Sequence, residues 1–119
     1  MEREFFLQWL KNHKYCVLAT SQDNKPWAAT VDYTVDDDLN MYVATSPVSL
    51  KFQNVKRNPV VCVVVDCQDV NGTLQIQGVA EERQPSEDNP ANLMIKPTFL
   101  IFKKKDEKTD EVEVKELKV

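Results

Sequence analysis

The stretch from residue 41 to 58 has the residue types and spacing of an anion-binding corner. A short apolar run ends at two hydroxyl residues, Thr45 and Ser46, and a turn then leads into a predicted helix over residues 48–57. Hydroxyls and free amide N–H groups at a helix N-terminus donate hydrogen bonds to phosphate oxygens, the helix dipole favours an anion, and Lys51 adds a formal charge. The pattern predicts a phosphate-binding corner. The plainer alternative is that Lys51 is an ordinary solvated lysine.

Other polar residues of this stretch have structural alternatives. Ser46 or Ser49 can cap the helix, which leaves other N–H groups of the first turn free for a ligand. We expect Asn54 to make a structural hydrogen bond rather than to bind a ligand. Lys56 and Arg57 would assist the corner lysine if they face the same way.

The composition limits the kind of protein that this chain can be. Its 119 residues are the size of one domain, and 42% hydrophobic with 29% charged residues is typical of a globular protein. The formal net charge of −4 disfavours general binding to nucleic acids or anionic membranes. With only two glycines, the chain lacks the common glycine-rich phosphate loops.

Cysteine and histidine usage bounds the chemistry further. Three cysteines without a C-x-x-C pair argue against a disulfide framework and favour a reducing compartment. The single histidine, His13, argues against a zinc site, and we expect no metal. Its place at the end of the first predicted helix suits a positive charge. The N-terminus does not have the pattern of a signal peptide, and the longest apolar run, residues 60–65, is too short to span a bilayer. A cytoplasmic protein is expected.

The elements that position the corner are mainly β-strands, in a single domain over residues 1–119. Strands are predicted over residues 15–19, 27–35, 39–44, 60–66, 73–82 and 98–103, with turns over 21–26, 36–38 and 69–72. An amphipathic helix is predicted over residues 2–13, a loop over 84–92, and an edge strand or a frayed tail over 104–119. This order favours an antiparallel barrel, whose small interior leaves a sizeable ligand outside or at a subunit interface.

Two of the predicted strands carry side chains of interest. Residues 60–66 are so apolar that we expect other parts of the protein to cover both faces of this strand, with Cys62 and Cys67 as small core residues. Elsewhere, the acidic residues 36–38 are predicted to form a solvated turn. Gln75 and Gln77 share one face of their strand, which is either the solvent side of the sheet or a source of amides for a ligand.

With these elements in order, the chain resembles the flavin-binding split-barrel family related to pyridoxamine 5′-phosphate oxidase. The resemblance covers residues 1–82. It rests on the N-terminal helix, residues 17–20, the turn before Pro26 and Trp27, residues 42–45, residues 49–51 with Asn54, and Asn58 with Pro59 before an apolar strand. The resemblance implies a mainly β fold, an FMN-binding split barrel of six to seven mostly antiparallel strands with short flanking helices.

The resemblance also implies a homodimer with two FMN molecules at the interface. The implied cofactor-binding residues are Ala29, Thr30 and Val31 beside the flavin ring and ribityl chain; Ala44, Thr45 and Ser46 along the cofactor; Ser49, Leu50 and Lys51 at the phosphate; and Thr73, Gln75 and Gln77 from the second subunit at the ring. Trp27 would then either fill the interface or stack on the flavin.

The chain departs from the oxidase in ways that bear on activity. Ala29 and Leu50 stand where the oxidase has arginines, and its C-terminal substrate residues have no counterpart. We therefore expect a small flavin-dependent oxidoreductase of unidentified substrate. Its reaction would move electrons between a nicotinamide donor and a small acceptor. We assign no side chain as catalytic. The alternatives are a non-catalytic carrier of flavin, haem or a deazaflavin on the same fold, and an interaction barrel without a cofactor.

Overall fold

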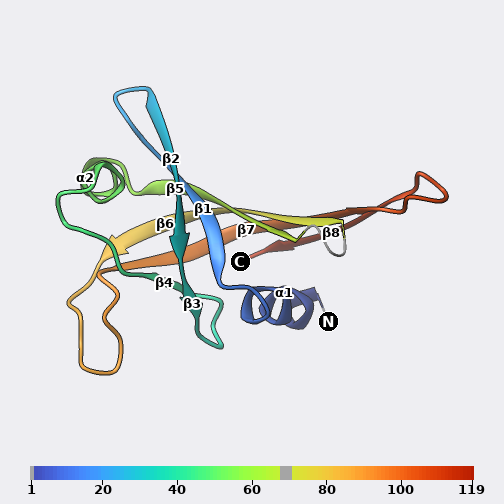
Figure 1. Ribbon diagram of the computed structural model, residues 1–119, viewed down its shortest axis with the longest axis horizontal. Coiled ribbons are helices and arrows are strands. Elements are labelled where there is room, and N and C mark those ends of the chain that lie inside the picture. Colours follow the sequence, from blue (N-terminus) through green and yellow to red (C-terminus); the bar gives the residue numbers. More distant parts are fainter. Residues whose placement is uncertain (1, 68–70) are drawn as a thin grey trace.

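The computed structural model describes residues 2–67 and 71–119, and it is mainly β (Figure 1). The described elements, in chain order, are α1 (Glu2–Lys11), β1 (Tyr15–Gln22), β2 (Lys25–Asp32), β3 (Thr34–Val35), β4 (Met41–Val43), α2 (Leu50–Arg57), β5 (Val60–Cys67), β6 (Gly72–Glu82), β7 (Leu93–Lys105) and β8 (Val112–Lys118). The strands form one antiparallel sheet of order β2-β1-β5-β6-β7-β4-β3, and β8 pairs with β7. The sheet curls into a split barrel, which confirms the predicted fold class.

The strand count among the described residues is eight, one more than the upper prediction. The segment predicted as one strand over residues 27–35 divides at Tyr33 into β2 and β3, because its pairing partner changes there. Up to Tyr33, whose amide donates to the Lys14 carbonyl over 3.0 Å, the segment pairs with β1, and from Thr34 it pairs with β4. The tail forms the edge strand β8 rather than fraying, and Leu117 of that strand packs on the core. Of the turn predicted over residues 69–72, positions 69 and 70 lie outside the described residues.

Two elements differ in length from their predictions for local reasons. The first turn shrinks to Asp23 and Asn24, both with positive φ (51° and 62°), so β1 and β2 extend into a two-residue hairpin. The last long strand begins at Leu93 rather than 98, because a register shift between Gln77 and Gly78 accommodates Pro97 inside the strand. A Cβ on Gly78 would lie 2.8 Å from the Lys96 carbonyl oxygen, so only glycine fits there.

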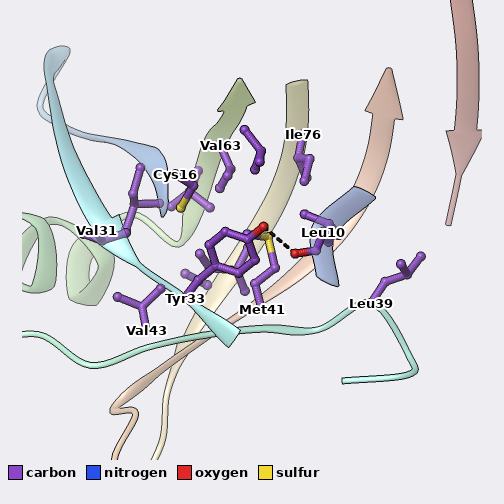
Figure 2. Close-up of a cluster of buried hydrophobic side chains, with 14 of the residues drawn as sticks. Leu10, Cys16, Val31, Tyr33, Leu39, Met41, Val43, Val63 and Ile76 are labelled. Atoms are coloured by element: carbon purple, nitrogen blue, oxygen red, sulfur yellow. Dashed lines mark hydrogen bonds between the residues drawn. The ribbon is translucent and has the colours of Figure 1, made fainter. Parts of the chain in front are cut away.

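The core lies on the concave side of the sheet, where α1 closes it (Figure 2). Phe6 and Leu10 of α1 are fully buried, as the amphipathic pattern predicted. The buried Tyr33 hydroxyl donates to the Leu10 carbonyl over 2.6 Å, which ties the end of α1 to the sheet. Burial, with a smaller contribution from Asp32, raises the pKa of the neighbouring Cys16 thiol to about 12.

The convex face of the sheet is open, which corrects one prediction. Along β5 the alternate residues 61, 63 and 65 are buried, whereas Val60 is 61% exposed and Cys62 is exposed. The expectation that β5 is covered on both faces, with Cys62 in the core, is therefore wrong for the single chain. A long apolar run indicates a buried strand, but it does not indicate whether one face of the strand or both faces are covered. The Cys67 side chain lies outside the description.

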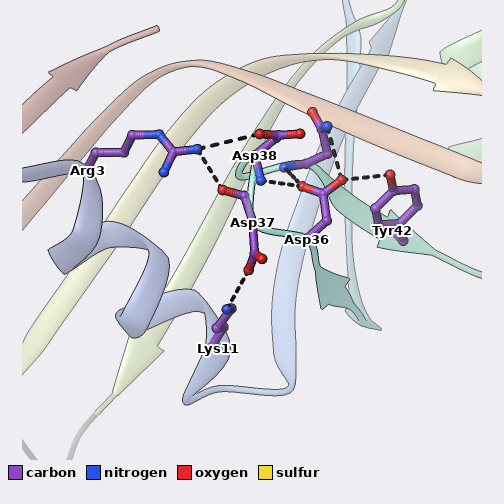
Figure 3. A network of polar contacts seen from close by, with 7 residues as sticks. Arg3, Lys11, Asp36, Asp37, Asp38 and Tyr42 are labelled. Carbon is purple, nitrogen blue, oxygen red and sulfur yellow. Dashed lines mark hydrogen bonds and ion pairs between the residues drawn. The ribbon is translucent and has the colours of Figure 1, made fainter.

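The turn after β3 binds α1 to the sheet through a polar network (Figure 3). Arg3 donates to the Asp37 carbonyl over 2.6 Å, and Lys11 pairs with the Asp37 carboxylate at 2.7 Å. The Asp37 and Asp38 side chains are exposed to solvent, as predicted, but the Asp36 side chain is partly buried. Its carboxylate accepts hydrogen bonds from the Tyr42 hydroxyl, the Asn40 amide and side chain, and the Asp38 amide.

Candidate functional site

The N-terminus of α2 lies where the sequence predicts the phosphate-binding corner. Ser49 caps the helix: its Oγ accepts a hydrogen bond from the Phe52 amide over 3.3 Å, and its own amide donates to the Ser46 carbonyl over 3.0 Å. Among the described residues, the amide N–H groups of Leu50 and Lys51 have no acceptor. The corner therefore offers two main-chain donors to an anion, with the positive end of the helix dipole behind them.

A hydroxyl pair borders these donors. Thr45 Oγ1 and Ser49 Oγ lie 3.3 Å apart, so the residue at the end of the β4 strand and the helix cap present their oxygens together. Ala44 and Ser46 flank the pair and are exposed. The structure thus brings four predicted site residues, Thr45, Ser49, Leu50 and Lys51, to one place.

Asn92 holds this hydroxyl pair from outside the predicted site. The Thr45 amide donates to Asn92 Oδ1 over 3.0 Å, and Asn92 Nδ2 donates to the Thr45 carbonyl over 2.7 Å. The Asn92 amide donates in turn to the Val43 carbonyl over 3.1 Å. The sequence contains no signal for this role, because 47 residues separate the two partners and Asn92 ends a segment predicted only as a loop.

Lys51 faces the body of the protein. Lys51 is half-buried and shares a helix face with the buried Asn54 and Val55, since residues three and four apart lie on one side of a helix. It has no ion-pair partner within the part of the chain that the structure describes. Asn54 Nδ2 donates to the buried Thr20 Oγ1 over 3.0 Å, which confirms the structural role predicted for this asparagine.

The other two cations of α2 do not assist the corner. Lys56 pairs with Glu82 of β6 at 3.8 Å and its ammonium lies 5.8 Å from the centre of the Phe52 ring, on the side away from Lys51. Arg57 is exposed at the opposite end of the helix from the cap. The condition under which Lys56 and Arg57 would assist Lys51, that they face the same way, is therefore not met, because the helical repeat places them on other sides of α2.

The β2 residues of the predicted site point to both sides of the sheet. Val31 is 8% exposed and belongs to the core, so only its main chain is available to a ligand. Ala29 shares the face of Val31, and Thr30 is exposed on the other face. Trp27, which is 49% exposed, shares the face of Ala29.

The β6 residues of the predicted site belong to another surface, the convex face of the sheet. Gln75 and Gln77 are exposed there, with Thr73 on the same side. They line up across the strands with apolar neighbours: Cys62, Gln77 and Phe99 form one row, and Val64, Gln75 and Ile101 the next. These six residues line most of a shallow pocket of about 250 Å³. In one chain this pocket and the α2 corner are separate.

The remaining observations concern His13, metal binding and membrane-spanning helices. The His13 ring lies 4.7 Å from the Trp9 ring, and its Nδ1 is 2.6 Å from the Trp9 carbonyl oxygen. Residues 2–67 and 71–119 contain no group of three or more His, Cys, Asp or Glu side chains that could hold a metal ion. Neither of the helices described is long and apolar enough to cross a membrane.

Comparison with known proteins gives a family and a fold. The model of the family described as pyridoxamine 5′-phosphate oxidase matches residues 3–115. The structure is similar to that of general stress protein 26 from Bacillus anthracis strain Sterne, with a TM-score of 0.75, 18% identity and 100% of both chains covered.

Two other solved structures are similar to this chain. One is a putative pyridoxamine 5′-phosphate oxidase from Listeria innocua, with a TM-score of 0.69, 21% identity, and 96% of this chain and 98% of that chain covered. The other is a pyridoxamine 5′-phosphate oxidase-related, FMN-binding protein from Nostoc punctiforme, with a TM-score of 0.62, 12% identity, and 98% and 93% covered. At these identities the structures show a shared fold. No curated protein sequence matches the chain.

Proposed function

The chain belongs to the pyridoxamine 5′-phosphate oxidase family, and on this premise we propose that it is a homodimeric flavoprotein that binds FMN at the α2 corner. The observation that carries the proposal is the position of two free amide N–H groups, of Leu50 and Lys51, beside the Thr45–Ser49 hydroxyl pair. The half-buried Lys51 side chain starts from the same first turn of α2. Neutral main-chain donors and one lysine are the groups that commonly bind a phosphate.

The residues of the corner fit a flavin phosphate in chemistry as well as in position. The Ser49 hydroxyl oxygen accepts the capping hydrogen bond from the Phe52 amide, so its hydroxyl hydrogen can still be donated to Thr45 or to a ligand oxygen. FMN, when bound, supplies the redox chemistry at its isoalloxazine ring. The protein's residues then hold the phosphate, fix the ribityl chain along β2 near Ala29 and Thr30, and exclude water from the ring.

The convex face of the sheet supports a dimer in this proposal. Val60 and Val17 are 61% and 38% exposed on that side, and the rows through Gln75 and Gln77 are bordered by Phe99 and Ile101. Burying such an apolar surface against a second copy contributes about 25 cal/mol per Å² of apolar area removed from water, which opposes the entropy lost on association. Within the dimer, Thr73, Gln75 and Gln77 of the partner subunit would border the flavin ring of the first.

We propose that the reaction moves electrons between a nicotinamide donor and a small-molecule acceptor in the cytoplasm. Pyridoxamine 5′-phosphate is a poor candidate for the substrate, because Ala29 and Leu50 replace two arginines of the oxidase. The corner and its neighbours contain hydroxyl, amide and ammonium groups rather than an acid–base pair, so the protein contributes binding and electrostatics to the reaction.

The purified protein tests the proposal directly. We expect added FMN to bind with quenching of its fluorescence, and NADH or NADPH to bleach the visible absorption of the bound flavin under anaerobic conditions. Binding without bleaching by either donor would favour the carrier alternative, which the replaced arginines and the short loop over residues 84–92 also suit. A protein that binds no flavin would contradict the oxidoreductase and the flavin carrier, and it would favour a carrier of haem or a deazaflavin or a barrel without a cofactor.

A further inference from the structure

The loop over residues 84–92 carries Asn92 to the phosphate corner. It extends beyond the ends of β6 and β7 (Figure 1). At its base the Arg83 amide donates to the Asn92 carbonyl over 2.9 Å, which continues the pairing of these two strands by one step. The Asn92 side chain then holds the main chain of Thr45, so the geometry of the corner depends on where the base of this loop lies.

A groove of about 380 Å³ lies between the loop and the start of α2. Its walls include Pro47 and Phe52 on the side of the helix and Gln84 and Pro85 on the loop. The groove leaves the loop less packing against α2. Hydrogen bonds from another part of the protein are therefore more important for holding the loop in place.

Arg83 supplies such hydrogen bonds from the end of β6. Its half-buried side chain donates through Nη1 to the Ala91 carbonyl over 2.5 Å and to the Asn89 carbonyl over 3.2 Å. Hydrogen bonds from a charged donor are stronger than those from a neutral one. Because Ala91 directly precedes Asn92, the guanidinium fixes the segment that presents the Asn92 amide to Thr45.

Tyr42 of β4 supports the guanidinium from the sheet. The Arg83 Cζ atom lies 5.4 Å from the centre of the Tyr42 ring, within the range of a cation–π contact. The Tyr42 hydroxyl donates to the Asp36 carboxylate over 2.9 Å, which holds the ring in its orientation (Figure 3). This hydrogen bond is the main reason why the pKa of Tyr42 lies above its ordinary value, so the hydroxyl keeps the proton that it donates.

We propose that Arg83 is a positioning residue of the phosphate corner, and that Tyr42 and Asp36 hold its guanidinium in place. These contacts form one chain that runs from Asp36 to Thr45. Arg83 acts through Asn92 rather than by touching the anion. The inference rests on the proposed function, because the anion bound at the corner is taken to be the FMN phosphate.

The variant Arg83→Met tests the inference, because it removes the charge and the donors but keeps a long side chain. We expect Arg83→Met to weaken FMN binding about tenfold, near the lower end of the value of a charge-assisted hydrogen bond. Riboflavin, which lacks the phosphate, should bind within about twofold of the wild type. Tyr42→Leu, which removes the ring, should weaken FMN binding about threefold, and Tyr42→Phe, which keeps it, should weaken FMN binding less. Fluorescence titration measures all of these affinities.

A double-mutant cycle decides whether Arg83 acts through Asn92. The protein with both Arg83→Met and Asn92→Ala should bind FMN about as weakly as Asn92→Ala alone, because Asn92→Ala already removes the group that Arg83 positions. If the two losses multiply in the double variant, Arg83 acts on the anion directly through its charge, and the inference is wrong.

Lys96→Met is the matched control, because it removes a cation from β7 together with its ion pair to Glu81 at 3.2 Å. It should change neither the FMN nor the riboflavin affinity. If Arg83→Met leaves FMN binding unchanged, or weakens FMN and riboflavin binding equally, Arg83 does not position the corner, while the proposed function stands. If the wild type binds neither flavin, the proposed function and the inference fail together.

Discussion

Asn92 completes the hydrogen bonding of Thr45 as a neighbouring strand would. Its side-chain amide donates to the Thr45 carbonyl over 2.7 Å and accepts from the Thr45 amide over 3.0 Å, just beyond the end of β4. The loop over residues 84–92 keeps this asparagine in place, because Arg83 donates to the Ala91 and Asn89 carbonyls. A residue outside the ligand contacts thus fixes the main chain that carries one of the corner hydroxyls.

Replacing Asn92 should loosen the corner more than the barrel. Asn92→Ala removes both bonds to Thr45, so we expect a loss of about 1–3 kcal/mol in the free energy of unfolding and weaker FMN binding. Riboflavin, which lacks the phosphate, should bind Asn92→Ala as it binds the wild type. Urea denaturation and fluorescence titration measure the two effects. An equal loss of affinity for riboflavin and FMN would show that Asn92 supports the fold alone.

Lys51 is the residue on which phosphate binding most depends. Lys51→Ala should weaken FMN binding by about 1.5–3 kcal/mol, the value of a charge-assisted hydrogen bond, and leave riboflavin binding unchanged. Arg57→Ala is the matched control, because it removes an exposed cation from the same helix. If both variants lose the same small amount of affinity, the lysine acts only through the general field of α2.

The Asp36 carboxylate predicts a pH-dependent stability. Partial burial opposes ionisation, but hydrogen bonds from the Tyr42 hydroxyl, Asn40 and the Asp38 amide outweigh it and hold the pKa of Asp36 below its ordinary value. The unfolded chain therefore binds more protons than the folded one as the pH falls below about 4, and the stabilisation present above that range is lost.

We expect Asp36→Asn to be less stable than the wild type at pH 7, with the difference shrinking as the pH falls below about 4. Urea midpoints measured from pH 3 to pH 7 would show this convergence. Asp88→Asn, in the exposed loop over residues 84–92, should follow the wild-type profile. Parallel curves for Asp36→Asn and the wild type would rule out the assigned role.

The convex face predicts the oligomeric state. Val64→Glu places a charge in the row with Gln75 and Ile101, so we expect it to convert a dimer into a monomer at micromolar concentration, seen by light scattering. Cys62 should then react faster with a thiol reagent, while buried Cys16, with a pKa of about 12, stays unreactive at pH 8. Val112→Glu, near the far tip of the sheet, is the control. A dimeric Val64→Glu protein would place the interface elsewhere.

Local patterns predicted the elements around the corner. The cap at Ser49, the stop at Asn58 and Pro59 and the alternation over residues 73–82 each depend on residues a few positions apart, so the helix and β6 lie where the sequence placed them. β7 was predicted to begin five residues too late, at 98 instead of Leu93, because Pro97 conceals a strand whose bulge forms only against Gly78.

The sequence by itself determined most element types, the fold class and the position of Thr45, Ser49 and Lys51 at the start of α2, because short-range spacing fixes capping and strand alternation. The tertiary structure alone decided that Asn92 holds Thr45, that Lys56 turns to Glu82, and that Cys62 lies on an open face. Each of these depends on strand pairing or on contacts between residues far apart in the chain, and hydrophobicity along a sequence does not specify which of two sheet faces meets the core.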